Sequence, residues 1–132
     1  MVPLALVVDD SMLFRHTVCR YLEERGCRVE SATNGEEALA MLRDLRPDII
    51  ITDLQMPKMD GYQLIKALKG RPETSAIPIV ILAAARSRTD KPEDAEADFV
   101  VFKDINIESQ LGQVLKKALL SSEGDNETSS QS

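Results

Sequence analysis

The sequence predicts an α/β fold, in which one doubly wound sheet of five parallel strands carries helices on both faces. Three observations predict it. Apolar runs alternate with segments of helical periodicity along the 132 residues. The strongest runs are apolar throughout, which is typical of strands covered on both faces. Two of these runs also end in aspartate, and in open parallel sheets ligands and chemistry gather outside the carboxyl ends of the strands.

Five segments supply the expected strands. Four of them are short runs whose hydrophobicity is continuous rather than alternating. The remaining segment, 27–32, is less apolar, and we expect it to lie at an edge of the sheet. In chain order the expected strands are residues 4–8, 27–32, 49–52, 78–83 and 99–102.

Helical periodicity fills the intervals between these strands. Two helix starts resemble capping boxes, formed by Asn34 with Glu37 and by Asp60 with Gln63. The last helix has the clearest apolar face, because its hydrophobic residues follow the i, i+3, i+4, i+7 rule. These residues are Leu111, Val114, Leu115, Ala118 and Leu119.

One interval breaks this pattern. Residues 84–97 contain no large apolar side chain. Pro92 suits the first position of a helix, but few residues remain before the last strand, so we expect the fourth helix to be short or mobile. Residues 121–132 are polar and acidic, which predicts a disordered tail. The folded domain is therefore expected to span residues 1–120.

Composition argues against several classes of function. The net charge is −6 at pH 7 and no basic stripe occurs, so direct binding to nucleic acid is not expected. No apolar stretch approaches the ~18–20 residues of a membrane span, and no signal peptide precedes the first strand. We therefore expect no membrane partner and a cytoplasmic location. Cys19 and Cys27 lack the spacing of a metal site, and we expect their side chains to pack as small apolar groups.

Three carboxylates are expected at one edge of the sheet. Asp9 and Asp10 follow the first strand, and Asp53 ends the third. Such a cluster is costly without a cation, and a few carboxylates with retained waters suit Mg²⁺ better than Ca²⁺. Lys103 follows the last strand and points at the same edge. For Asp9 or Asp10 alone, capping of the first helix is a competing interpretation.

A metal beside a carboxylate at this edge permits two kinds of chemistry. It can bind the phosphate of a substrate, or it can help the carboxylate to attack phosphorus and form an aspartyl phosphate. A phosphatase with an aspartate nucleophile usually needs a second acid two residues later, where this chain has Gln55. Dinucleotide binding is not favoured, because no GxGxxG motif follows the first strand.

Four motifs with a specific spacing surround these residues. They are Val7-Val8-Asp9-Asp10-Ser11, Thr52-Asp53-Leu54-Gln55-Met56-Pro57-Lys58-Met59-Asp60-Gly61, Ile77-Pro78-Ile79-Val80, and Ala97-Asp98 leading to Lys103. Through these motifs the chain resembles the receiver domain of two-component response regulators over about residues 1–120. The resemblance implies a flavodoxin-like sheet with the strand order 2-1-3-4-5.

The resemblance also implies a role for each clustered residue. Asp53 would accept a phosphoryl group from a histidine kinase, a histidine phosphotransfer protein or a small acyl phosphate. Asp9 and Asp10 would hold Mg²⁺, with Asp53 and the backbone carbonyl of Gln55 completing the protein ligands. Lys103 would pair with the phosphoryl group. A receiver is a phospho-acceptor rather than an enzyme, apart from self-phosphorylation and self-dephosphorylation.

Several positions depart from the family pattern. Receivers usually carry Ser or Thr at the end of the fourth strand, where the hydroxyl binds a phosphoryl oxygen and pulls the following loop inward; here the residue is Ala83. The usual aromatic three residues before the lysine is replaced by Val100, and Phe99 would face the other side of the strand. Asp104 replaces a proline that is often cis, and we expect a trans bond because cis costs ~3–4 kcal/mol before other residues.

Phosphate binding is expected to survive these departures. Ala84 still offers a backbone N–H to the phosphoryl oxygens, and the lost hydroxyl is worth on the order of 1.5–3 kcal/mol. Gln55 and Ala85 flank the expected path of an attacking water. Neither side chain is acidic, so no general base is expected for hydrolysis of the aspartyl phosphate.

Two functions are open at this point. The leading hypothesis is a stand-alone, chemotaxis-regulator-like response regulator that is phosphorylated on Asp53 and signals by protein–protein interaction, with non-standard switching. An unidentified downstream protein, or a histidine phosphotransfer domain, would receive the signal. The phosphodonor is expected to dock on the first helix and the loops around it, and the domain to be a monomer or weak dimer. The alternative is a pseudo-receiver that binds proteins independently of phosphorylation.

Overall fold

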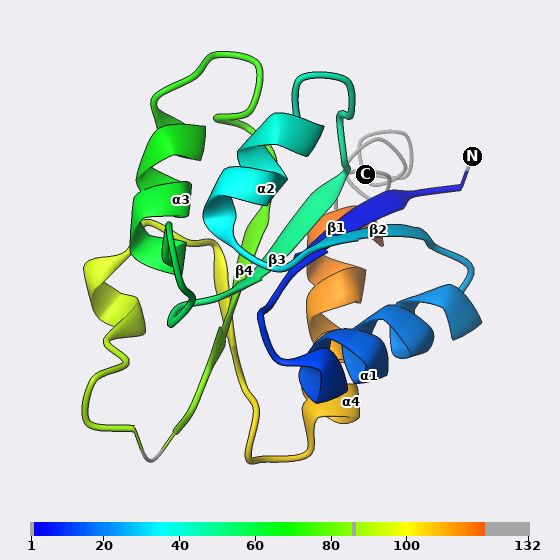
Figure 1. The fold of residues 1–132 in the computed structure, drawn as a ribbon. Helices are drawn as coiled ribbons and strands as arrows, with labels where there is room; N and C mark the ends of the chain where they lie inside the picture. Colours follow the sequence, from blue (N-terminus) through cyan, green and yellow to red (C-terminus); the bar gives the residue numbers. More distant parts are fainter. Residues whose placement is uncertain (1, 86, 121–132) are drawn as a thin grey trace, which may run out of the picture.

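The computed structural model describes residues 2–85 and 87–120, and these residues adopt the predicted doubly wound fold. Within them, five parallel strands form one sheet in the order β2-β1-β3-β4-β5 (Figure 1). The less apolar β2 lies at an edge, as expected. The strands are β1 (Leu4–Val8), β2 (Arg28–Ala32), β3 (Ile49–Asp53), β4 (Ile79–Ala83) and β5 (Phe99–Phe102).

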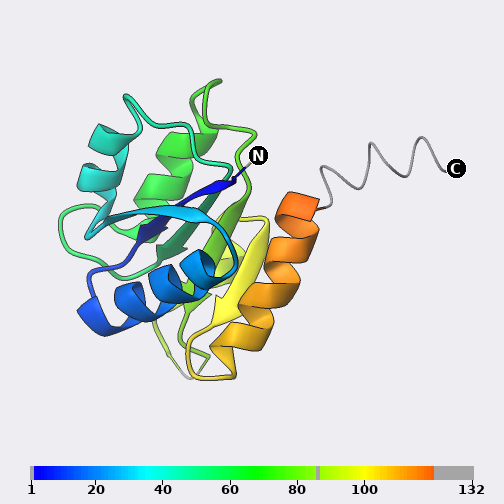
Figure 2. The ribbon, with the colours of Figure 1, turned by 90° about the vertical axis from the view of Figure 1, so that its right-hand side faces the viewer.

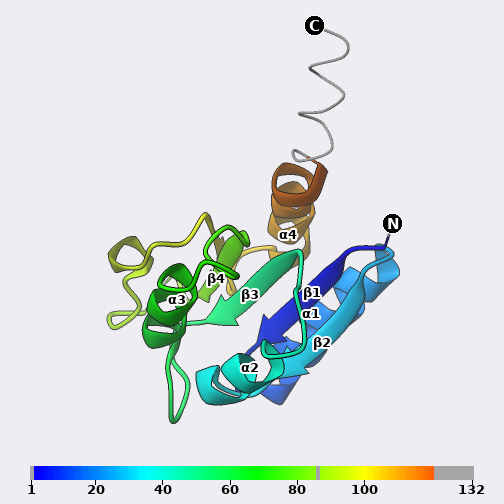
Figure 3. The same cartoon turned by 90° about the horizontal axis from the view of Figure 1, so that it is seen from above.

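In the described part of the chain, two helices cover each face of the sheet (Figures 2 and 3). One face packs against α1 (Met12–Glu24) and α4 (Ile107–Leu115), which continues as a π-helical turn over Lys116–Leu120. The other face packs against α2 (Gly35–Met41) and α3 (Gly61–Lys69). Every residue of β3 and β4 is buried between these layers, which explains why both strands are apolar almost throughout.

The starts of α2 and α3 follow the local sequence. Asp60 and Gln63 form the predicted capping box at α3, because each side chain accepts a hydrogen bond from the backbone N–H of the other. At α2, Asn34 accepts from the backbone N–H of Glu37, but the Glu37 carboxylate accepts from Thr33 instead of Asn34. Only half of that predicted box is therefore present.

The cap of α1 corrects one interpretation of the sequence. Ser11 is the N-cap residue, and its hydroxyl accepts from the backbone N–H of Phe14 at 3.4 Å. Capping by Asp9 or Asp10 is therefore wrong. Both carboxylates instead remain at the edge of the sheet.

The interval between β4 and β5 contains a single 3₁₀ turn, Pro92–Asp94, and its described residues form no α-helix. This agrees with the short helix expected between the fourth and fifth strands. The bond between Lys103 and Asp104 is trans, as expected, and residues 2–85 and 87–120 contain no cis peptide bond.

The predicted disordered tail, 121–132, lies outside the described residues. Within the described ranges, no helix combines the length and the hydropathy needed to cross a bilayer.

Gly61 sets the distance between α3 and the end of β3. Its backbone N–H donates to the carbonyl oxygen of Leu54 at 2.9 Å. A Cβ atom at this position would overlap the carbonyl oxygen of Asp53 and lie 2.8 Å from the Cα of Leu54. The close approach therefore requires glycine.

Gly61→Ala is expected to lower the free energy of unfolding by about 1–3 kcal/mol, because the added methyl group meets backbone that cannot move aside. Gly70→Ala is the matched control at the other end of α3: its φ is −82° and its nearest neighbouring atom would be 3.4 Å away. Urea unfolding of both variants measures the difference. Equal midpoints would contradict the role assigned to Gly61.

Candidate functional site

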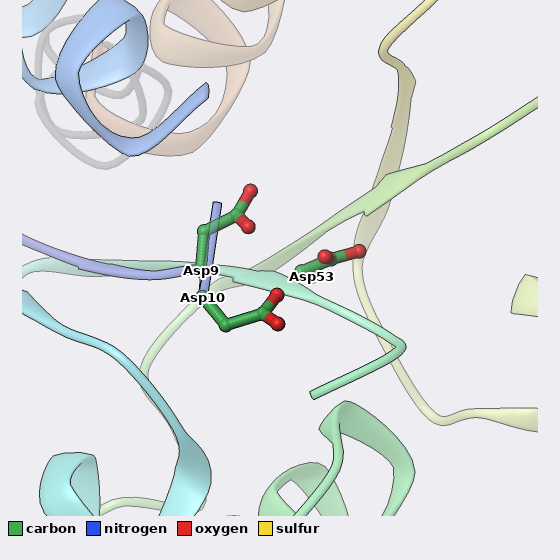
Figure 4. Close-up of side chains that lie close together, drawn as sticks. All are labelled: Asp9, Asp10 and Asp53. Atoms are coloured by element: carbon green, nitrogen blue, oxygen red, sulfur yellow. The ribbon is translucent and has the colours of Figure 1, made fainter. Parts of the chain in front are cut away.

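Two neighbouring strand ends bring the three predicted carboxylates together. β1 and β3 are hydrogen-bonded with Val8 opposite Thr52, so the residues after these positions meet at one edge. Asp9, Asp10 and Asp53 each place one carboxylate oxygen within 4.8 Å of the others (Figure 4). The juxtaposition expected from the sequence is therefore present.

The three carboxylates differ in burial and in their hydrogen bonds. Asp9 is fully buried, and its Oδ1 accepts from the backbone N–H of Ser11 at 2.9 Å. Asp53 is 7% exposed, and its Oδ1 accepts from the backbone N–H of Leu54 at 2.8 Å. Asp10 is exposed. The Oδ2 atoms of the two buried residues are thus left for a charged partner.

Lys103 is that partner. Its Nζ lies 3.0 Å from Oδ2 of Asp9 and 3.0 Å from Oδ2 of Asp53, so one ammonium group bridges both buried carboxylates. The same Nζ lies 4.5 Å from the centre of the Phe14 ring on α1. The position of Lys103 after β5 predicted its direction. The contact with Phe14 was missed, because only the packing of α1 against the sheet reveals it.

Burial and mutual repulsion determine the charge of the site. Burial, and then the neighbouring Asp9 carboxylate, raises the pKa of Asp53 to about 6, although Lys103 opposes this shift. Burial alone would lower the pKa of Lys103, but Asp53 and Asp9 outweigh it and raise that pKa above its ordinary value. At neutral pH Asp53 is therefore mostly ionised and Lys103 is positively charged.

The cluster has the chemistry of a site for a hard divalent cation. All three aspartates offer carboxylate oxygens, which Mg²⁺ prefers. Asp9 Oδ2 is buried without a hydrogen bond from any described residue, and Lys103 is the cation paired with it. Three carboxylates carry more negative charge than one ammonium group neutralises. The residues present therefore fit a bound Mg²⁺ ion.

The end of β4 lacks a side-chain hydroxyl, as the sequence indicates. A carboxylate from the following interval, which was not predicted, binds the backbone there. Ala83 is fully buried at the last position of the strand. The backbone N–H of Ala84 donates to Asp90 Oδ2 at 2.9 Å. The other oxygen of Asp90, Oδ1, accepts from the side-chain amide of Gln55 at 3.2 Å. No local pattern marks Asp90, because it lies in an irregular polar interval.

The next backbone donor is occupied in the same way. The N–H of Ala85 donates to Oδ1 of Asp104 at 2.9 Å. In the sequence, Asp104 is notable only as the replacement of a proline. In the structure, the Asp104 side chain connects the loop after β5 to the backbone just beyond β4.

β5 carries aromatic side chains on both faces but none at position 100. Val100 is 37% exposed and lies opposite Ile81. Phe99 packs in the core beneath α1 and α4, so it does not replace the usual aromatic. Phe102, opposite Ala83, packs against the core beneath α2 and α3. This residue was missed, although alternation along the strand places it on the same side as Val100.

Comparisons with known proteins identify the same family that the sequence motifs resemble. The response regulator receiver domain family matches residues 5–116. The gliding motility regulatory protein of Myxococcus xanthus is 41% identical over 100 residues, which are 74% of this chain and 13% of that protein. Protein PilG of Pseudomonas aeruginosa is 32% identical over 111 residues, which are 83% of this chain and 82% of that protein.

A solved structure is similar over almost the whole fold. The chemotaxis response regulator CheY4 of Vibrio cholerae superposes with a TM-score of 0.79 at 32% identity, covering 90% of this chain and 100% of that one. The chain thus spans a small part of the Myxococcus protein but most or all of the two shorter relatives.

Asp53→Asn is expected to stabilise the metal-free domain at pH 8. Because the pKa of Asp53 is raised, its protonated form stabilises the fold fully below the ordinary pKa of 3.8, and this contribution is lost as the pH rises through about 6. Removing the charge should raise the free energy of unfolding by about 1–3 kcal/mol at pH 8 in EDTA, and by little near pH 4. Urea titrations at both pH values measure these differences.

Mg²⁺ provides the control for this electrostatic account. It should stabilise the wild type by binding the folded state, and stabilise Asp53→Asn much less. A variant less stable than wild type at pH 8 without metal would contradict the raised pKa.

Proposed function

The chain belongs to the response regulator receiver domain family, and we propose that it accepts a phosphoryl group on Asp53. The observation that carries this proposal is the carboxylate at the end of β3, whose Oδ2 lies 3.0 Å from Lys103 Nζ beside Asp9 and Asp10. A nucleophilic carboxylate must be ionised. With a pKa of about 6, Asp53 meets this requirement at neutral pH.

The transfer step follows from these groups. The Asp53 carboxylate attacks the phosphorus of a phosphohistidine or a small acyl phosphate, and the bond from phosphorus to the imidazole nitrogen or acyl oxygen breaks. Lys103 pairs with the phosphoryl oxygens, on which charge develops in the transition state. Asp9, Asp10, Asp53 and the backbone carbonyl of Gln55 would hold a Mg²⁺ ion, which would supply further charge neutralisation.

A phosphodonor protein has an apolar surface to dock on beside the carboxylates. The first turn of α1 exposes Met12 and Leu13, which are 74% and 72% exposed, and Ile105 after β5 is also exposed. Both segments lie at the edge of the sheet where β1 and β3 end (Figure 1). We therefore assign the docking of a histidine kinase or histidine phosphotransfer protein to α1 and the loops around it.

We propose further that the domain signals by binding other proteins, with non-standard switching. Ala83 offers no hydroxyl, and Val100 occupies the usual aromatic position. The similarity to the chemotaxis response regulator CheY4 supports a signalling role for this domain. Its phosphorylated state would be read by a downstream protein or passed to a histidine phosphotransfer domain in the cytoplasm.

A pseudo-receiver is the second candidate function. The missing hydroxyl at Ala83 and the occupied N–H of Ala84 favour it, whereas the complete set of carboxylates and Lys103 favours phosphotransfer. Partner capture by Asp53→Ala separates the two. Binding equal to wild type is expected of a pseudo-receiver, and loss of binding would exclude it.

Wild-type protein incubated with acetyl phosphate and Mg²⁺ is expected to gain one phosphoryl group by intact mass spectrometry. Asp53→Asn should gain none, because an amide does not attack phosphorus. Asp44→Asn, which removes an exposed carboxylate far from the strand ends, is the control and should be modified like wild type. Modification of Asp53→Asn to the wild-type level would refute the acceptor role.

Leu13→Glu should slow phosphotransfer from a phosphorylated histidine phosphotransfer domain about tenfold or more, because it places a charge in the apolar docking surface. Modification by acetyl phosphate should not change, since a small donor needs no docking. Val2→Glu is the matched control: Val2 is exposed but precedes β1, at the opposite edge of the sheet. Equal rates for Leu13→Glu and wild type in a stopped-flow or gel assay would disprove docking at this turn.

A further inference from the structure

The backbone donors just beyond β4 are occupied by the chain's own carboxylates. The N–H of Ala84 donates to Asp90 and the N–H of Ala85 to Asp104, both at 2.9 Å. Neither residue belongs to the strand ladder, which ends with Ala83. Successive backbone N–H groups that bind anionic oxygens at the edge of a sheet form an anion-binding position.

This anion-binding position adjoins the phosphate acceptor. In the ladder between β3 and β4, Asp53 pairs with Leu82, two residues before Ala84. Lys103, which contacts Asp53, follows the strand on the other side of β4. A phosphoryl group on Asp53 therefore projects from the same edge as the N–H of Ala84. That donor would stabilise a phosphoryl oxygen, but Asp90 already holds it.

Asp90 is kept in place by contacts with three segments. Its Oδ1 accepts from the Gln55 side chain in the loop after β3. Its backbone N–H donates to Ser87 Oγ at 3.0 Å, which closes a tight turn. The next backbone N–H, that of Lys91, donates to the hydroxyl of Tyr62 on α3 at 2.7 Å. The position of Asp90 is thus linked to β3, to β4 and to α3.

We propose that Asp90 is a positioning residue that occupies the place of a phosphoryl oxygen at the Ala84 N–H while Asp53 is unmodified. The inference rests on the proposed function of Asp53. Two anionic groups cannot share one donor, and they repel each other strongly at a partly buried edge. Arrival of the phosphoryl group therefore expels the Asp90 carboxylate and breaks its bond to Gln55.

The expulsion gives the domain a conformational response that does not need a hydroxyl at Ala83. Because Asp90 and Lys91 are consecutive, displacement of Asp90 also displaces the backbone that contacts Tyr62. The response has the opposite direction to that implied for receivers with Ser or Thr at the end of the fourth strand. There the hydroxyl pulls the loop inward; here the phosphoryl group pushes Asp90 outward.

Beryllium fluoride, a mimic of the phosphoryl group on aspartate, tests this inference in the full chain at saturating Mg²⁺. Asp90→Ala removes the competing acceptor and is expected to bind about tenfold more tightly than wild type. Asp90→Asn, which is neutral but still accepts a hydrogen bond, should lie between them. Asp94→Asn is the matched control, because it removes an exposed carboxylate from the adjacent 3₁₀ turn.

Amide NMR supplies a readout that a purely structural role would not change. The Ala84 amide should shift on binding in every variant that binds. The Lys91 amide should shift in wild type, where Asp90 leaves, and barely in Asp90→Ala.

The possible outcomes separate this inference from the proposed function. Unchanged or weaker binding by Asp90→Ala would overturn the role of Asp90 and leave phosphate acceptance by Asp53 intact. An equal gain in Asp94→Asn would also overturn it, because net charge alone would explain the effect. Failure of wild type and all variants to bind would contradict the proposed function, and this inference with it.

Discussion

Asp9 and Asp53 are buried carboxylates on adjacent strands, and their mutual repulsion is the constraint to which this edge of the sheet is adapted. Lys103 meets the constraint by placing one ammonium group 3.0 Å from each of them. This pairing requires β5 to lie two strands from β3 and to end at the same edge. The strand order, the burial of the acids and the position of the lysine therefore depend on one another. The charge that Lys103 leaves uncompensated is what makes the site suitable for a divalent cation.

The sheet with its helices and the interval between β4 and β5 are stabilised in different ways. The sheet and its helices are held by buried aliphatic side chains, whereas the interval from Ala84 to β5 has no large apolar residue to bury. Its contacts with the rest of the domain are largely hydrogen bonds, among them those of Asp90 and of Lys91 with Tyr62. Hydrogen bonds at a solvated edge contribute little net stability each. The interval is therefore held less strongly than the sheet, as regions with few buried apolar contacts generally are.

Most of the fold could be predicted from the sequence because its signals are local and repeated. Continuous apolar runs identify the buried strands, and the requirement that parallel strands end at one edge brings Asp9, Asp53 and Lys103 together. Asp90 could not be predicted, since its position depends on the path of an irregular interval without periodicity. The cap of α1 was ambiguous for a different reason: aspartate and serine are both good N-caps, and only the backbone shows that Ser11 has this role.

Phe14 connects the first turn of α1 to the cluster of buried carboxylates, through its contact with Lys103. Its ring contacts the ammonium group of Lys103, and it follows the exposed Leu13 in the helix. A protein bound over this turn and an anion bound to Lys103 therefore act on neighbouring atoms. By thermodynamic linkage, a partner that binds more tightly when Lys103 has moved toward a phosphoryl group must strengthen phosphoryl binding by the same factor. If a phosphodonor docks on this turn as proposed, a single aromatic ring separates its docking surface from the lysine that pairs with the phosphate acceptor.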